Sequence, residues 1–171
     1  MTAQTAAAME VAKKAVPVKQ ASSDLFDSVF DSITRRAFEL FEGNGRWPGN
    51  ELADWFRAES EVLHPVHLEL RESEDSFSVE AEVPGFDPKD LEITVEPRTL
   101  RIAGERERHE EKKKGKALRS EWCANRILRT IDLPAEIDTG KASASLKAGI
   151  LTIELPKAPH AKSVPIEPKA T

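Results

Sequence analysis

The stretch Ala144-Ser-Leu-Lys-Ala-Gly-Ile-Leu-Thr-Ile-Glu-Leu155 predicts two antiparallel strands joined by a tight turn. Gly149 lies where such a turn often needs a positive φ, which glycine tolerates. After it, Leu151, Ile153 and Leu155 alternate with polar residues, as in a strand with one buried and one solvated face. Pro156 ends the second strand because proline cannot donate to the ladder of a sheet.

Similar short alternating runs occupy the chain between residues 62 and 157. They begin at Val66, Phe77, Leu91, Leu100 and Trp122 and are separated by turn residues; Gly104 is expected to end the fourth of them. No helical pattern intervenes. Short strands at this spacing predict an all-β core built as an antiparallel β-sandwich.

The first 61 residues follow a different pattern and hold most of the aromatic side chains. Residues 24–42 carry an apolar stripe at helical spacing, which predicts an amphipathic helix. A breaker cluster follows at residues 43–49, and Asn50 can cap a second, short helix. Residues 1–22 show no sustained period and are interpreted as a mobile tail.

Composition excludes several classes of protein. The chain has 171 residues, enough for one ordinary domain with extensions, and a net charge of −5 argues against nucleic acid as a partner. A single cysteine, Cys123, excludes an intrachain disulfide. We find neither a run of about 20 apolar residues that could insert in a membrane nor a signal peptide, so a cytoplasmic location is expected.

Four ordered motifs resemble the small heat-shock proteins of the Hsp20, or α-crystallin, family, in their bacterial and plant-like form. They are Val83-Pro84-Gly85, Lys89-Asp90-Leu91-Glu92-Ile93, Leu100-Arg101-Ile102-Ala103-Gly104-Glu105-Arg106, and the stretch quoted first, which is similar to the signature A-x-x-x-n-G-v-L. Ala148 stands where the family usually has Asn, so we expect a different turn geometry there.

The resemblance implies an immunoglobulin-like β-sandwich, the α-crystallin domain, at residues 62–157, between an N-terminal arm at 1–61 and a flexible extension at 158–171. It also implies an ATP-independent chaperone, a holdase, that binds partly unfolded client proteins. The helix could instead simply pack on its own domain. If it binds clients, the contacts expected are Phe26, Phe30, Ile33, Phe38, Phe41, Trp55 and Phe56.

Self-assembly is implied by three further features of the resemblance. Leu91, Ile93 and Val95 on one side, with Ala142, Ala144 and Leu146 on the other, would line a groove between edge strands. Val164 and Ile166 of the tail motif Val164-Pro165-Ile166 would fill that groove in a neighbouring chain. The mostly charged loop after Glu105 would carry a swapped strand to the partner of a dimer, whose contacts would be Val66, Leu68, Leu70, Ala117, Leu118 and Arg129.

A search for catalytic groups finds none that converge. The sequence lacks the glycine-rich phosphate loop and the G-x-S-x-G nucleophile motif. His109 begins a zincin-like run without the second histidine, and the four histidines show no metal-ligand spacing with Cys123. We therefore predict no enzyme, cofactor or metal. The alternative function is a monomeric, non-chaperone binding module like the related sandwich of Hsp90 co-chaperones.

Overall fold

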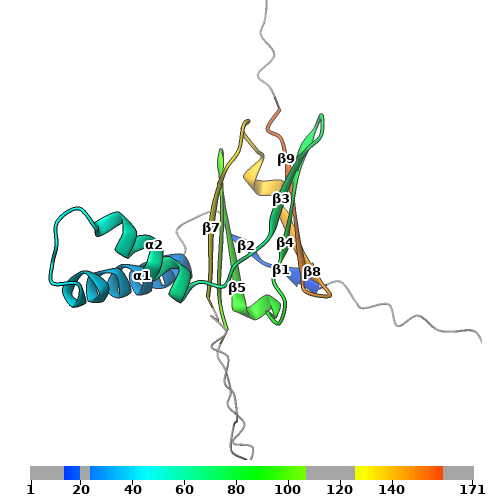
Figure 1. The fold of residues 1–171 in the computed structure, drawn as a ribbon. Coiled ribbons are helices and arrows are strands. Elements are labelled where there is room, and N and C mark those ends of the chain that lie inside the picture. Colours follow the sequence, from blue (N-terminus) through cyan, green and yellow to red (C-terminus); the bar gives the residue numbers. More distant parts are fainter. Residues whose placement is uncertain (1–13, 20–23, 107–125, 160–171) are drawn as a thin grey trace, which may run out of the picture.

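Two β-sheets pack face to face, and two helices lie outside them (Figure 1). The computed structural model describes residues 14–19, 24–106 and 126–159. Within these residues one sheet has the strand order β1-β8-β9-β4-β3 and the other the order β2-β5-β6-β7. This arrangement confirms the predicted all-β sandwich with a helical N-terminal region.

The strands are short, as the spacing of turn residues predicts. The first sheet consists of β1 (Lys14–Val16), β8 (Ser143–Lys147), β9 (Ile150–Pro156), β4 (Ser76–Glu82) and β3 (Leu68–Glu72), and the second of β2 (Val18–Lys19), β5 (Leu91–Glu96), β6 (Thr99–Glu105) and β7 (Arg126–Asp132). The helices are α1 (Asp24–Gly43) and α2 (Glu51–Val62), with single turns η1 (Pro88–Asp90) and η2 (Thr139–Lys141). Neighbouring strands are antiparallel except β2 and β5, which are parallel.

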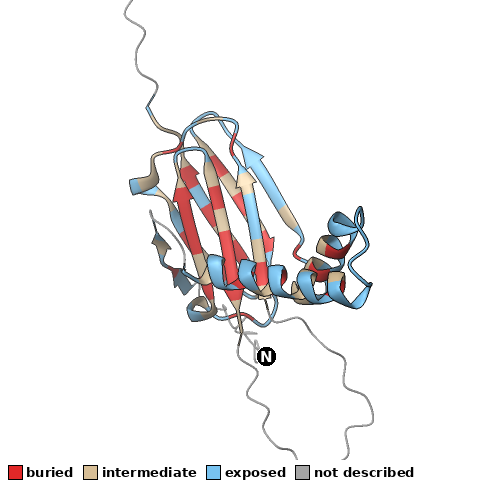
Figure 2. Cartoon of the chain, turned by 90° about the vertical axis from the view of Figure 1, so that its left-hand side faces the viewer, coloured by how far each residue is buried: buried red, intermediate tan, exposed pale blue. Residues whose placement is uncertain are grey.

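The core follows from the alternation along the strands. On β4 and β9, for example, Phe77, Val79 and Ala81 lie opposite Leu155, Ile153 and Leu151, and all six are almost fully buried. Each large aliphatic or aromatic side chain buried in this way contributes about 1.5–3 kcal/mol. Along the strands in Figure 2, buried residues in red alternate with paler, less buried residues.

Gly104 does not end its strand, contrary to the sequence-based expectation. It pairs with Leu91 inside the β5–β6 ladder. A Cβ at this position would lie 3.1 Å from the Leu91 side chain and 3.3 Å from Phe86. Close packing therefore favours glycine here, because a Cβ would require these neighbours to move by a few tenths of an ångström, and β6 continues to Glu105.

The segment of residues 14–19 also differs from expectation. The sequence pattern placed it in a mobile tail, but it forms β1 and β2, one at the edge of each sheet. Six residues are too few to show a local period, and their partners on β5 and β8 lie more than 70 positions away along the chain. Such pairing leaves no signal in the neighbouring sequence.

Helix α1 crosses the outer face of the second sheet, and α2 packs beside it at one end (Figures 1 and 2). Thr94 on β5 and Ala103 on β6 alternate with core residues and so face outward, yet each is only 1% exposed, on the face where α1 lies. Asn50 is at the N-cap of α2 as expected, but its side chain makes no capping hydrogen bond. Its carbonyl oxygen accepts the first hydrogen bond of the helix, from the Asp54 amide at 2.9 Å.

The turn between β8 and β9 has positive φ at both central residues, 50° at Ala148 and 77° at Gly149. This is the primed hairpin turn that Asn-Gly favours, because its twist matches that of the strands. The expectation of a different geometry at Ala148 is therefore wrong. The register of β8 on β9 imposes the turn, and Ala148 adopts a conformation that is strained for a residue with a Cβ.

We expect Ala148→Asn to stabilise the fold by about 1 kcal/mol, because asparagine tolerates the left-handed region better than alanine. Urea unfolding at matched protein concentration would measure the change. Gly149→Ala is the matched opposite: its φ is 77° and the new Cβ would lie 3.3 Å from Cα of Pro84, so stability should fall. A destabilised Ala148→Asn variant would contradict the assignment of the turn.

Candidate functional site

The residues predicted to line a groove lie on or beside β5 and β8, the strands that adjoin β2 and β1 at the open side of the sandwich. We call this open side the edge groove and define it by the six predicted residues. Five of them, Leu91, Ile93, Val95, Ala144 and Leu146, are at most 8% exposed, and Ala142 packs partly buried against the same apolar cluster. The structure thus brings both predicted walls together.

The edge groove is occupied by the chain's own residues 14–19. Val16 pairs with Ala144 on β8, and Val18 pairs with Ile93 on β5, so the segment crosses from one sheet to the other. Val16 is 4% exposed and Val18 packs partly buried on the same cluster, whereas Pro17 between them points to solvent. Sequence reasoning missed this segment. The available signal was Val16-Pro17-Val18, which has the same form as Val164-Pro165-Ile166.

Two ion pairs flank the segment. Lys19 donates to the carboxylate of Glu92 on β5, whose side chain keeps only 13% of its exposure, and Lys14 lies 4.0 Å from Asp87. The hydrogen bond with Glu92, and secondarily the charge of Asp24, raise the pKa of Lys19 above its ordinary value. This end of the groove therefore favours a base.

Helices α1 and α2, the helix pair, enclose a small core of their own. It consists of Ile33, Leu40 and Ala58, with partly buried Trp55 packed against it. Leu128 of β7 also joins this cluster and so connects the helix pair to the sandwich.

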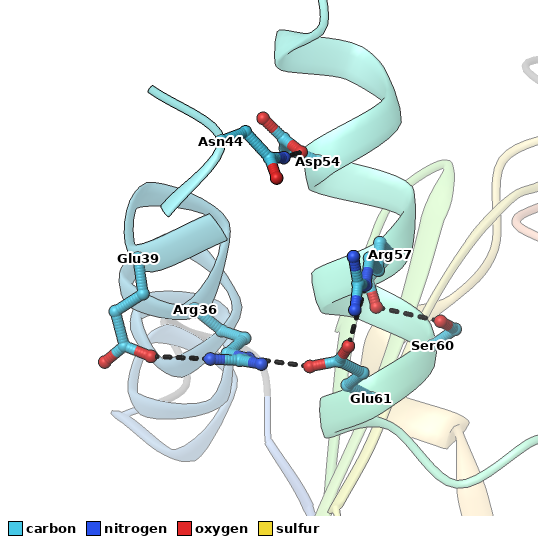
Figure 3. Close-up of polar contacts among 7 residues, drawn as sticks. All are labelled: Arg36, Glu39, Asn44, Asp54, Arg57, Ser60 and Glu61. Atoms are coloured by element: carbon cyan, nitrogen blue, oxygen red, sulfur yellow. Dashed lines mark hydrogen bonds and ion pairs between the residues drawn. The ribbon is translucent and has the colours of Figure 1, made fainter. Parts of the chain in front are cut away.

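Polar contacts supplement this small core (Figure 3). Arg36 of α1 donates to Glu61 of α2 at 2.6 Å, and Asn44 donates to Asp54 at 2.7 Å. Glu61 also accepts from Arg57, and these two guanidinium groups, Arg36 first, hold the pKa of Glu61 below its ordinary range.

Exposed large apolar side chains gather on the helix pair and its connecting loop. Among the described residues they are Phe30, Phe38, Trp47, Leu52 and Phe56, against only Leu70 and Ile150 on the sandwich. Of the seven predicted client contacts, Phe30, Phe38 and Phe56 are 43–58% exposed. The most exposed, Trp47 at 70% and Leu52 at 65%, were not in the predicted set.

The other four predicted contacts are less accessible. Phe26, Phe41 and Trp55 are half-buried, and Ile33 is buried between the helices. Arg101 lies over the Phe26 ring, 5.4 Å from its centroid, and the Trp55 ring lies 5.3 Å from that of Phe30. Client binding by these residues stays a prediction.

The predicted dimer contacts are only partly described. Leu68 and Leu70 lie on β3, the edge strand of the first sheet, with Leu70 36% exposed. Val66 is buried, and its carbonyl oxygen accepts from Arg129 at 2.8 Å within the same chain. Ala117, Leu118, Val164 and Ile166 lie outside the described residues.

The described part of the chain holds neither a cluster of metal ligands nor a membrane-spanning helix. There, no three His, Cys, Asp or Glu residues gather as metal ligands. The described helices are not long and apolar enough to cross a membrane.

Comparison with known proteins matches the sandwich to one family. The model of the Hsp20/alpha crystallin family matches residues 69–168. The chain belongs to this family. Spore protein SP21 of Stigmatella aurantiaca is 31% identical over 127 residues, which are 72% of this chain and 75% of that protein. Small heat shock protein C2 of Rickettsia felis is 34% identical over 59% of this chain and 66% of its own length.

A solved structure and a second family model extend the comparison. A small heat-shock protein from Xylella fastidiosa is 26% identical, with a TM-score of 0.50, over 62% of this chain and 97% of that one. A model described as a protein of unknown function (DUF2934) matches residues 31–64, which include most of α1 and all of α2. The helix pair therefore corresponds to a sequence unit distinct from the sandwich.

We expect Arg36→Gln to increase the opening of α2 severalfold, because Glu61 loses its main partner. Hydrogen exchange of the α2 amides, followed by mass spectrometry, would measure it. Arg35→Gln removes the same charge from the neighbouring position and is the control.

The stabilisation by Glu61 also depends on pH. Since the pKa of Glu61 is lowered in the fold, its contribution to stability is fully present above the ordinary glutamate pKa of about 4.3 and is lost as pH falls through the folded value. Equal exchange in both variants at neutral pH would contradict this assignment.

Proposed function

We propose that the protein is an ATP-independent holdase that acts in the cytoplasm. It would bind apolar surface on partly unfolded proteins and so reduce the concentration of free, aggregating species by mass action. The observation that carries the proposal is the concentration of exposed aromatic side chains on the helix pair, in a chain of the small heat-shock family.

Exposed apolar patches on a folded protein usually mark interaction sites. Phe38 and Phe56, each 58% exposed, lie on different helices of the pair, and Trp47 and Leu52 lie between them along the chain. Aromatic rings offer large contact areas for little loss of side-chain entropy, which suits a surface that must accept varied partners. The small core of the helix pair allows it to open and present its half-buried rings as well.

Assembly is proposed to use two edges of the sandwich. The outer edge of β3 is available within the described strands and would receive a strand from the loop of a dimer partner. The tail motif Val164-Pro165-Ile166 would dock in the edge groove of a neighbouring chain and join dimers into larger particles. The Xylella fastidiosa relative is described as having a distinct high order structure.

A non-chaperone binding module is the competing proposal. It would be a monomer and would leave client aggregation unchanged. The exposed aromatics and the family match favour the holdase. An enzymatic role has no supporting observation.

The purified protein is expected to suppress light scattering by a heated client protein without ATP. Phe38→Ser combined with Phe56→Ser should raise the amount of protein needed for half suppression severalfold, because it removes two exposed rings. Ile150→Ser, which alters a 39% exposed residue on the sandwich, is the matched control. Failure of the unmodified protein to suppress scattering would reject the holdase.

Val164→Ala combined with Ile166→Ala is expected to convert larger particles into dimers of two 19.0 kDa chains. Size exclusion coupled to light scattering would give the particle mass. Pro168→Ala, outside the motif but in the same tail, is the control. An unchanged mass in the double variant would show that the tail motif does not drive assembly, and monomers in its place would reject the dimer.

A further inference from the structure

The edge groove already holds a ligand, and that ligand differs from the tail motif in charge. Residues 14–19 read Lys-Ala-Val-Pro-Val-Lys, whereas the tail reads Lys-Ser-Val-Pro-Ile-Glu at residues 162–167. Both place proline between two β-branched residues. They differ at the following position, where Lys19 corresponds to Glu167.

We propose that the edge groove binds a four-residue motif in which a proline lies between two β-branched residues and a basic residue follows. Residues 14–19 are its internal ligand, and Glu92 selects the basic residue. The inference rests on the proposed use of this groove for assembly and adds its specificity. A tail from a second copy must displace residues 14–19 before it can dock.

The groove recognises the apolar part of the segment through the spacing of its two β-branched side chains. Val16 on β1 and Val18 on β2 are two residues apart and both contact the core cluster, while the intervening Pro17 is exposed. Proline restricts φ near −65°, so the free segment loses less conformational entropy on docking. Backbone pairing at Val16 with β8 and at Val18 with β5 holds the segment across both sheets.

Glu92 recognises the basic residue of the segment. Its carboxylate accepts from Lys19, and Asp24 adds negative charge nearby. Glu92 keeps only 13% of its side-chain exposure, so it is less well screened than a surface acid. A tail seated in the same direction would place Glu167 against these two acids. Lys89 lines the same hollow as Glu92 and would offset only part of this repulsion.

The first test measures peptide binding to the full chain in which both the internal ligand at residues 14–19 and the tail motif are disabled. Val16→Ser, Val18→Ser, Val164→Ser and Ile166→Ser together would vacate the groove. A labelled peptide of residues 13–20 should bind about threefold to tenfold more tightly than the same peptide with Lys19→Glu, by fluorescence anisotropy. Adding Glu92→Lys to the protein should reverse the order. Equal binding of the two peptides would overturn the assignment of Glu92.

The second test needs no core substitution. Hydrogen exchange should show protection of those amides of β1 and β2 that donate to β8 and β5 in the unmodified protein. Protection should fall with Lys19→Glu and return when Glu92→Lys is added. Fast exchange at residues 14–19 in the unmodified chain would overturn the internal ligand.

These readouts require no client, so the two proposals can fail separately. Binding of the 13–20 peptide without suppression of aggregation would reject the holdase and support the groove assignment. The opposite result is suppression of aggregation together with binding of the tail peptide but not of the 13–20 peptide. It would reject the internal ligand and support the holdase.

Discussion

The open side of the sandwich is the constraint on which the other features depend. Two sheets that are not joined by hydrogen bonds leave an edge on each, at β8 and at β5, and leave core side chains such as Ile93 and Leu146 beside the gap. Uncovered backbone edges recruit other strands. Residues 14–19 cover both edges at once, because Val16 pairs with the first sheet and Val18 with the second. Any other strand that binds here must match this apolar spacing.

The same covering segment leads directly to the helix pair. Only four positions separate the end of β2 from the start of α1, and α1 then crosses the outer face of the sheet to which β2 belongs. Arg101 on β6 lies over Phe26 near the start of that helix. Displacement of residues 14–19 would therefore remove an anchor next to α1. The segment that occupies the edge groove therefore lies next to the helix pair that carries the exposed aromatic side chains.

Sequence reasoning succeeded where the signal is local. Alternation along residues such as Leu151, Ile153 and Leu155 predicts both the strand and its buried face, and Gly149 predicts the turn. It failed where contacts with residues distant in the sequence determine the backbone conformation. Ala148 adopts a positive φ because the register of β8 on β9 requires it, although alanine does not favour it. Val16 and Val18 become strand residues only because β8 and β5 offer open edges. The spacing of the helical aromatics predicted helices, but not which rings α2 would cover.

The exposure of those rings follows from the size of the helix pair. Its two helices fully bury only a few side chains between them, Ile33, Leu40 and Ala58, and need Leu128 of the sandwich to complete the cluster. A unit this small cannot enclose all of its aromatic residues. Arg36, Glu61, Asn44 and Asp54 therefore contribute to holding the helices together, through polar contacts that leave the outer rings free. Limited burial, which weakens the helix pair as a fold, is what keeps Phe38 and Phe56 available to a partner.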